Sequence, residues 1–90
     1  MVEKEATIGP SEGLHARPAA IFVKESKRYA AEIKVIKDGR EVNAKSSLQI
    51  LTVGAKKGES ITIRAEGEDA ERAVEALAEL ISREEPPDES

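Results

Sequence analysis

The feature that most constrains the fold is the pair Asp38-Gly39, which stands between two segments of alternating apolar and polar residues. A two-residue hairpin turn of type I′ needs a positive φ at both central positions, and Asp-Gly is among the pairs that adopt it most readily. Ile33 and Val35 alternate with charged residues before the turn, and residues 40–44 return after it. The sequence therefore predicts two antiparallel strands joined by a tight turn.

Alternation over residues 2–8 and over residues 61–66 predicts two more half-buried strands. Between the first strand and the hairpin the period becomes helical, from about Ala16 to the neighbourhood of Tyr29. Pro18 suits the first turn of this helix, because its missing N–H costs nothing there. The apolar face of this helix is expected to consist of small residues for the most part: Ala16, Ala19, Ala20, Val23 and Ala30.

Two further helices are expected in the second half of the chain. A short apolar segment, Leu48 to Val53, predicts a brief helix. Asp69 is expected to cap a long amphipathic helix. The apolar stripe of that helix has three–four spacing and comprises Ala70, Ala73, Val74, Leu77, Ala78 and Ile81. The predicted order is β-α-β-β-α-β-α, an α+β fold with a small antiparallel sheet and helices over one face.

The chain has 90 residues, of which 39% are apolar, enough for one modest core. Residues 1–82 are expected to form a single domain. Residues 83–90 contain two prolines and four acids, so they are expected to form a flexible acidic tail. No apolar run approaches the roughly 20 residues that cross a bilayer, and the N-terminus lacks the apolar block of a signal peptide. The sequence therefore predicts a cytoplasmic protein without membrane insertion.

Composition excludes several function classes. The net charge is −4, and with two aromatic residues there is no stacking platform for nucleic acid. The absence of Cys and the single His argue against a metal cluster. The charge is uneven, because residues 1–64 carry 12 Lys and Arg against 8 Asp and Glu, and residues 65–90 carry 2 against 10. Asn43 and Gln49 are the only side-chain amides, and this depletion with many charges predicts a thermophilic source.

His15 is the first candidate for chemistry, because it stands between a Gly-containing loop and a helix start. Unpaired backbone N–H groups and the positive end of the helix dipole favour an anion there. Arg17 adds a guanidinium that can bind two phosphate oxygens at once. A His in this setting, with no metal partner and no second base, indicates a phosphorylated histidine. A helix N-cap without chemical function fits the spacing equally well, so the residues alone leave both interpretations open.

Ser46 is the second candidate. Ser46 and Gln49 have the spacing of a capping box, in which side-chain and backbone groups satisfy each other at a helix start. Capping alone explains this pattern. The functional alternative is a phosphorylation site, because a phosphate at a helix N-terminus is tolerated and changes the surface charge by about two units.

The sequence GLHARPA at residues 13–19, followed by VNAKS at residues 42–46, resembles the HPr family of phosphocarrier proteins. These proteins belong to the bacterial phosphoenolpyruvate-dependent sugar phosphotransferase system. The likeness runs over residues 2–82 with no obvious gap. It implies an open-faced β-sandwich, in which a four-stranded antiparallel sheet carries three helices on one face, in agreement with the order predicted above.

The resemblance also implies a carrier rather than an enzyme. Enzyme I would pass phosphate from phosphoenolpyruvate to Nδ1 of His15, which would hand it to the IIA domain of a sugar permease, with Arg17 steadying the phosphoryl group. No cofactor or metal is implied. Ser46 matches the position that a serine kinase/phosphorylase modifies in many relatives, which weakens the exchange and in some creates a docking form for a transcriptional repressor. The partners of this presumed monomer would bind over the first two helices, at Ala16, Pro18, Ala20, Lys24, Lys27, Ser47, Leu48 and Leu51.

Three residues depart from the family pattern. Glu12 stands where relatives commonly have a small polar residue, and it is expected to place a negative charge close to the phosphate. Ser47 replaces a usually apolar surface residue, so hydrophobic docking at the second helix is expected to weaken. Gln49 replaces a common Gly and is expected to improve the cap of that helix.

Two other functions remain open. One is a regulatory binding module on the same fold, of the nitrogen-related or repressor-docking kind, which acts by docking in one phosphorylation state. The other is an unrelated small α+β interaction domain in which His15 has no function. Phosphorylation of His15 by enzyme I would separate the carrier from both.

Overall fold

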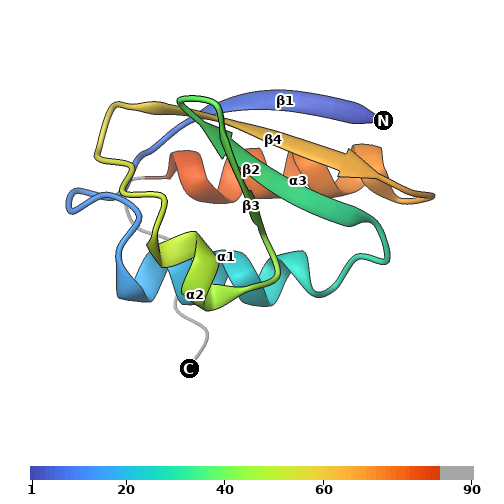
Figure 1. Cartoon of the computed structure of the whole chain (residues 1–90), viewed down its shortest axis with the longest axis horizontal. Coiled ribbons are helices and arrows are strands. Elements are labelled where there is room, and N and C mark those ends of the chain that lie inside the picture. The colour runs from blue at the N-terminus through green and yellow to red at the C-terminus, as the bar shows by residue number, and fades with distance from the viewer. Residues whose placement is uncertain (84–90) are drawn as a thin grey trace.

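The computed structural model describes residues 1–83. Its elements follow the predicted order (Figure 1): β1 Val2–Thr7, α1 Ala16–Ser26, β2 Glu32–Lys37, β3 Arg40–Asn43, α2 Ser47–Leu51, β4 Ser60–Glu66 and α3 Ala70–Ser82. Apart from Arg83, the predicted acidic tail lies outside the described residues. Within residues 1–83 no helix is both long enough and apolar enough to cross a bilayer.

The four strands form one antiparallel sheet in the order β1-β4-β2-β3. The last strand of the chain therefore lies in the middle, where Ile63 is paired with Lys4 of β1 and with Val35 of β2. In Figure 1 α3 passes behind the sheet, while α1 and α2 lie along its lower edge. Side chains facing the helices, such as Ile63 and Val35, are fully buried, and their neighbours Thr62 and Arg64 on the other face are part-exposed. The predicted open-faced sandwich is confirmed.

The hairpin that connects β2 to β3 has the predicted turn. Asp38 has a φ of 52° and Gly39 a φ of 80°, as a type I′ turn requires. Lys37 and Arg40 are paired across the turn, and this register continues along both strands. The register places Arg40 at the first position of β3, at the edge of the sheet nearest to α2.

The buried face of α1 differs from the predicted one. The structure buries the larger residues of the helix together with a serine: Pro18, Ala19, Ile21, Phe22, Val23 and Ser26. Ala16, Ala20 and Ala30, which were expected on that face, are exposed, and Ala30 lies beyond the end of the helix. The reason is area, because burying Ile21 and Phe22 contributes about 1.5–3 kcal/mol each, far more than a methyl group does. The helix also ends at Ser26, before Tyr29, and the Ser26 hydroxyl donates to the Phe22 carbonyl.

The start of α3 also differs in detail. Asp69 occupies the N-cap position, as predicted, but its side chain makes no bond to the helix. Its carboxylate instead accepts the backbone N–H groups of Ala30 and Ala31, each at 2.9 Å. The bond from Ala30, followed by that from Ala31, lowers the pKa of the Asp69 carboxyl. Asp69 thus joins the connection that follows α1 to the start of α3, and all six residues of the predicted α3 stripe are buried.

Candidate functional site

His15 lies at the N-cap of α1 with an extended backbone, at φ −104° and ψ −165°. Its side chain is exposed and makes no capping hydrogen bond. The first turn contains no acidic residue. The first intrahelical bond runs from the N–H of Ala19 to the carbonyl of His15 at 2.8 Å. Because Pro18 has no N–H, the backbone donors that this helix start presents are those of Ala16 and Arg17.

The loop before His15 is held by a distant segment. The N–H of Leu14 donates to the carbonyl of Ala55 at 2.9 Å, and the Leu14 side chain is buried. Gly13 has a φ of 78°, and a Cβ at this position would lie 2.5 Å from the same carbonyl oxygen. A side chain at position 13 would therefore be strained and would also collide with backbone. This contact fixes the direction in which the chain enters α1 and presents His15.

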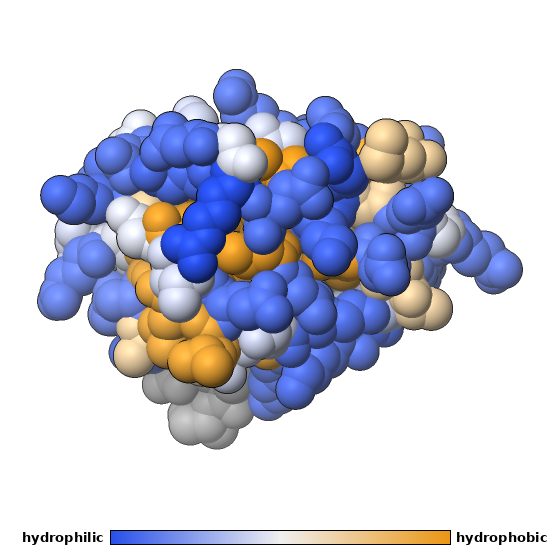
Figure 2. Space-filling view, viewed as in Figure 1, coloured by the Kyte–Doolittle hydropathy of each residue, from blue (hydrophilic) through white to orange (hydrophobic). Residues whose placement is uncertain are grey.

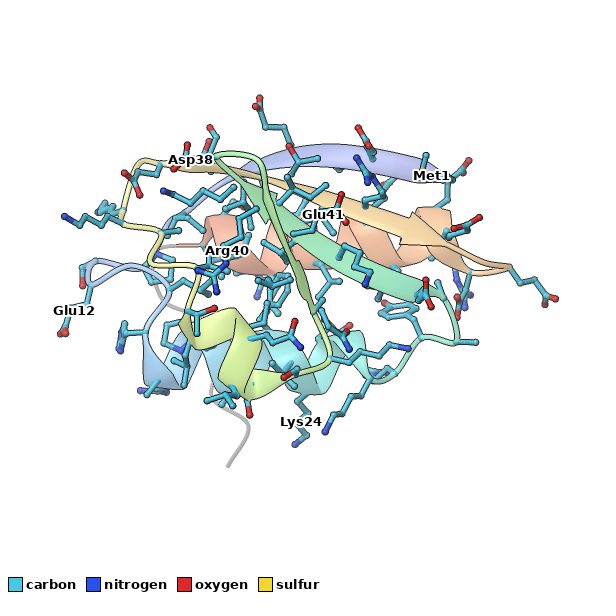
Figure 3. All side chains as sticks on the ribbon, viewed as in Figure 1. Met1, Glu12, Lys24, Asp38, Arg40 and Glu41 are labelled. Carbon is cyan, nitrogen blue, oxygen red and sulfur yellow. The ribbon has the colours of Figure 1, made fainter. Side chains whose placement is uncertain are left out.

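Arg17 and Glu12 lie on either side of His15 in the chain. Arg17 is exposed in the first turn of α1, so the guanidinium and the imidazole belong to the same end of the helix. Glu12 stands at the outer tip of the loop, and Figure 3 shows its side chain pointing outward, away from α1. The expected negative charge is therefore at the periphery of the site. Within residues 1–83 no cluster of His, Asp and Glu is arranged to hold a metal ion.

Ser46 caps α2. Its hydroxyl oxygen accepts the N–H of Gln49 at 3.3 Å, as the predicted capping box requires. The second hydrogen bond of the predicted capping box is absent, because the Gln49 side chain does not accept the N–H of Ser46. The Gln49 amide oxygen accepts the N–H of Asn43 at 2.8 Å, and the N–H of Ser46 donates to the Asn43 carbonyl. Gln49 therefore fastens α2 to the end of β3 instead of completing its cap.

The residues expected to dock partners are exposed with one exception. The exposed ones are Ala16, Ala20, Lys24, Lys27, Ser47, Leu48 and Leu51. Pro18 is buried in the first turn of α1, so it offers a partner little surface. Figure 3 shows Lys24 pointing away from the sheet.

The apolar part of this surface lies on α2. Leu48 is 76% exposed and Leu51 is 46% exposed. Figure 2 shows a hydrophobic patch over α2 at the lower left of the molecule, with polar residues on its right. We call Leu48 and Leu51 together the leucine patch. Apolar surface of this kind, rimmed by polar side chains, is typical of a protein-binding site.

The sequence did not reveal the residues that hold this site in place. Ala55 supports Leu14 through its carbonyl, which any residue type would supply, so no local signal identifies it. Arg40 was seen only as part of a strand, yet its guanidinium contacts the end of α2. Arg40 and Thr52 are twelve residues apart, so no local sequence pattern predicts their contact.

Comparison with known proteins identifies the family. Residues 2–83 match the family described as PTS HPr component phosphorylation site. The phosphocarrier protein HPr of Borreliella burgdorferi is 48% identical over 81 residues, which cover 90% of this chain and 94% of that protein. The HPr-like protein Crh of Halalkalibacterium halodurans is 44% identical over 84 residues, covering 93% of this chain and all of that protein.

Solved structures agree with these relatives. A crystal structure of HPr from Thermoanaerobacter tengcongensis has a TM-score of 0.86 at 43% identity, and it covers 90% of this chain and 91% of that one. An HPr dimer from the same organism has a TM-score of 0.70 at 45% identity, covering 87% of this chain and 92% of that one. Fold, sequence and family match are consistent over nearly the whole chain. The chain therefore belongs to the HPr family of phosphocarrier proteins of the phosphotransferase system.

Proposed function

We propose that this chain relays a phosphoryl group from phospho-enzyme I to the IIA domains of sugar permeases through a phosphohistidine at His15. The observation that carries the proposal is the exposed His15 imidazole at the N-cap of α1, whose side chain makes no capping hydrogen bond. The N-terminus of a helix favours an anion, so the phosphoryl oxygens would be stabilised there. An exposed site also suits a carrier, because two different partners must reach the same atom.

The chemistry is a displacement at phosphorus. The Nδ1 lone pair of neutral His15 attacks the phosphoryl group of enzyme I, a phosphorus–nitrogen bond forms, and the bond to the donor breaks. In a second displacement, a nucleophile of the IIA domain attacks the same phosphorus, the phosphorus–nitrogen bond breaks, and the imidazole of His15 is regenerated. The Arg17 guanidinium and the helix-start N–H groups oppose the charge on the phosphoryl oxygens. The chain is consumed and restored in each cycle, so it acts as a carrier and not as an enzyme.

Docking would use the exposed residues of α1 and the leucine patch. Lys24 and Lys27 supply positive charge that steers an acidic partner, and Leu48 and Leu51 supply apolar area. Ser47 is exposed next to Leu48 and contributes a hydroxyl to this surface. The carrier must leave each partner quickly, so a small apolar patch with charged neighbours suits short-lived complexes better than a large one.

We propose that Ser46 is the regulatory site of this chain, modified by a serine kinase/phosphorylase. Its hydroxyl is half-buried and accepts a bond from Gln49, and a phosphate at this helix start would still find that donor. The added charge would stand close to the docking surface of α2 and weaken the approach of acidic partners. A transcriptional repressor with a basic surface would gain from the same charge.

We propose further that the chain works as a monomer in the cytoplasm of a thermophilic bacterium. The support for a monomer is that partners need α1 and α2 uncovered. Light scattering at micromolar concentration tests this, and a dimer like that of the Thermoanaerobacter HPr would contradict it. A melting midpoint within the ordinary mesophile range of about 45–65 °C would contradict the thermophilic origin.

The relay is tested by incubating the chain with enzyme I and labelled phosphoenolpyruvate. The expected product carries label that is lost in acid and kept in base, and His15→Ala abolishes it. The labelled chain should then lose its label to a IIA domain. Absence of label on the wild-type chain, with enzyme I of the same organism, would refute the relay. For Ser46, acid-stable label from ATP and the kinase of that organism is expected, and Ser46→Ala should remove it.

A regulatory binding module is the second candidate, because the Crh protein of Halalkalibacterium halodurans is nearly as similar as the phosphocarriers. The two functions give different results in the two labelling experiments. A carrier passes its label from His15 to a IIA domain, whereas a regulatory module takes label at Ser46 and binds a repressor without delivering phosphate. The presence of both His15 and Arg17 favours the carrier.

A further inference from the structure

The helix that carries the leucine patch is too short to hold its own orientation. α2 comprises Ser47–Leu51, and among these residues only Ile50 is buried. Isolated helices below about 12 residues are marginal in water even with favourable sequences. The position of Leu48 and Leu51 on the surface therefore depends on contacts that fasten α2 to the rest of the fold.

Arg40 provides such a contact from the neighbouring β-hairpin. Its Nη1 donates to the carbonyl of Thr52 at 3.0 Å, and its Nη2 donates to Oγ1 of Thr52 at 2.8 Å. The Thr52 hydroxyl in turn donates to the carbonyl of Gln49 at 2.6 Å. Figure 3 shows Arg40 extending from β3 toward the end of α2. A guanidinium at this point satisfies the carbonyl of Thr52, the C-cap residue of α2, and opposes the negative end of the helix dipole.

The contact between Arg40 and Thr52 lies close in the chain to the segment that supports the His15 loop. Three residues after Thr52, the carbonyl of Ala55 accepts the N–H of Leu14. The chain between them makes a tight turn with Gly54 at a φ of 69°. From the middle of α2, the side chain of Gln49 accepts the N–H of Asn43. β3 thus holds α2 at two points, and its attachment through Arg40 lies next to the segment that supports His15.

We propose that Arg40 is a positioning residue, which holds α2 and its leucine patch in the orientation that phosphoryl-transfer partners require. This inference rests on the proposed function, because the partners are those of the His15 relay. Both Nη atoms of Arg40 are used within the chain, so its contribution comes from geometry rather than from a contact to the partner. A lysine at this position would keep the charge but would not form the two-pronged contact.

The kinetic test uses Arg40→Ala and Arg40→Lys as substrates of enzyme I. Loss of the contact is expected to raise KM by about three- to ten-fold for both variants, with kcat unchanged within about two-fold. Lys4→Ala is the matched control, because it removes an exposed cation from β1 at the opposite edge of the sheet. The rise in KM should persist at high salt, since screening weakens long-range steering but not an internal contact.

A direct measurement of α2 accompanies the kinetics. The N–H of Val53 bonds to the carbonyl of Ile50 at the end of the helix. Its hydrogen exchange is expected to be faster in both Arg40 variants and unchanged in Lys4→Ala. Wild-type behaviour of Arg40→Lys, or a KM effect that disappears at high salt, would overturn the inference in favour of charge steering. Faster exchange with unchanged KM would overturn it as well.

The two proposals fail in different ways. If the wild-type chain takes no label at His15, the proposed function fails, while hydrogen exchange at Val53 still reports whether Arg40 holds α2. If the wild-type chain is labelled normally and the Arg40 variants match it in KM, the relay stands and the positioning role is refuted.

Discussion

The two helices that carry the proposed site begin in opposite ways. At the start of α1, the His15 side chain is exposed and caps nothing. At the start of α2, the Ser46 hydroxyl accepts a backbone N–H, and Gln49 ties the same turn to β3. The helix start that would receive a phosphoryl group is left open. α2 is only five residues long and has to be held in place, and side-chain hydrogen bonds of Ser46 and Gln49 satisfy and anchor its start.

The difference shows how stability is distributed. A Ser, Thr, Asp or Asn cap contributes typically about 1 kcal/mol, and α1 forgoes it. This helix is instead held by burial, because Phe22 is fully buried and Ala19 nearly so. α2 buries only Ile50, so side-chain hydrogen bonds matter more to it. An open helix start is compatible with a stable helix only where packing compensates.

The largest effect is expected when the open start is closed. His15→Ser should abolish phosphoryl transfer completely, because the nucleophile is gone. The same change should stabilise the fold by about 0.5–1 kcal/mol, since the extended backbone at position 15 suits a serine cap. Labelling and urea denaturation measure the two outcomes. His15→Ala is the control, which should lose transfer without gaining stability. Destabilisation by serine would show that α1 does not need a cap.

The next largest effect is expected at Arg17. Arg17→Ala should slow transfer at His15 by about 100-fold, because a preorganised positive group near the phosphoryl oxygens is lost. Single-turnover transfer from enzyme I measures the rate, and the Kd of the complex measures docking. Lys24→Ala, which removes a docking cation farther along α1, is the comparison, and it should weaken binding with little change in the single-turnover rate. Equal losses in rate and in binding would mean that Arg17 only docks the partner.

The loop before α1 is expected to tolerate no side chain. Gly13→Ala should cost about 1–3 kcal/mol, because a Cβ there combines a positive φ with a collision against Ala55. Gly54→Ala is the matched control, since Gly54 also has a positive φ but open space around its Cβ position. Thermal or urea unfolding gives the difference between the two variants. If both variants lose the same free energy of unfolding, the backbone at Ala55 shifts to accommodate a Cβ at position 13 at little cost.

A smaller effect is expected at the closed start. Ser46→Ala should destabilise the fold by about 1 kcal/mol, because the N–H of Gln49 loses its acceptor. Ser47→Ala, at the next exposed position, should change stability little. Unfolding in urea measures both. If the two variants are equally stable, Ser46 is not an energetically important cap, and the contrast between the helix starts weakens.

The smallest effect is expected at Asp69, whose side chain serves neither as cap nor as part of the site. Its folded pKa is lowered by the N–H groups of Ala30 and Ala31, so its stabilising effect exists above the unfolded pKa. That effect disappears as the pH falls through the folded pKa, below the ordinary value of 3.8. Asp69→Asn should therefore be less stable than wild type at neutral pH, with the difference vanishing in acid. Unfolding across this pH range, with Glu68→Gln as control, tests the sign.

Much of the fold could be predicted from sequence because its signals are local. The Asp38-Gly39 turn needs two positive φ values, and only such residue pairs provide them without strain. The stripe of α3 repeats at the helical period, so its buried face follows from spacing alone. His15 and Arg17 became candidates because a Gly-containing loop before a helix start is also a local pattern. These features depend on residues within a few positions of one another.

The predictions that were wrong concern residues whose partners are remote. Gln49 had the spacing of a capping box, but its side chain accepts the N–H of Asn43 at the end of β3 and not that of Ser46. Asp69 stands at its predicted cap position but bonds to the chain after α1. The buried side of α1 follows its largest apolar residues, because the sheet and α3 decide which face they cover.

The sequence by itself determined the order of elements and the hairpin turn, and it singled out His15 as the candidate phosphate carrier. Only the tertiary structure decided how that residue is presented. The His15 loop takes its direction from the carbonyl of Ala55, and α2 takes its orientation from Arg40 and Gln49. The physical reason is that periodicity and turn chemistry are properties of neighbouring residues. Hydrogen bonds between distant segments depend on where the folded chain brings them.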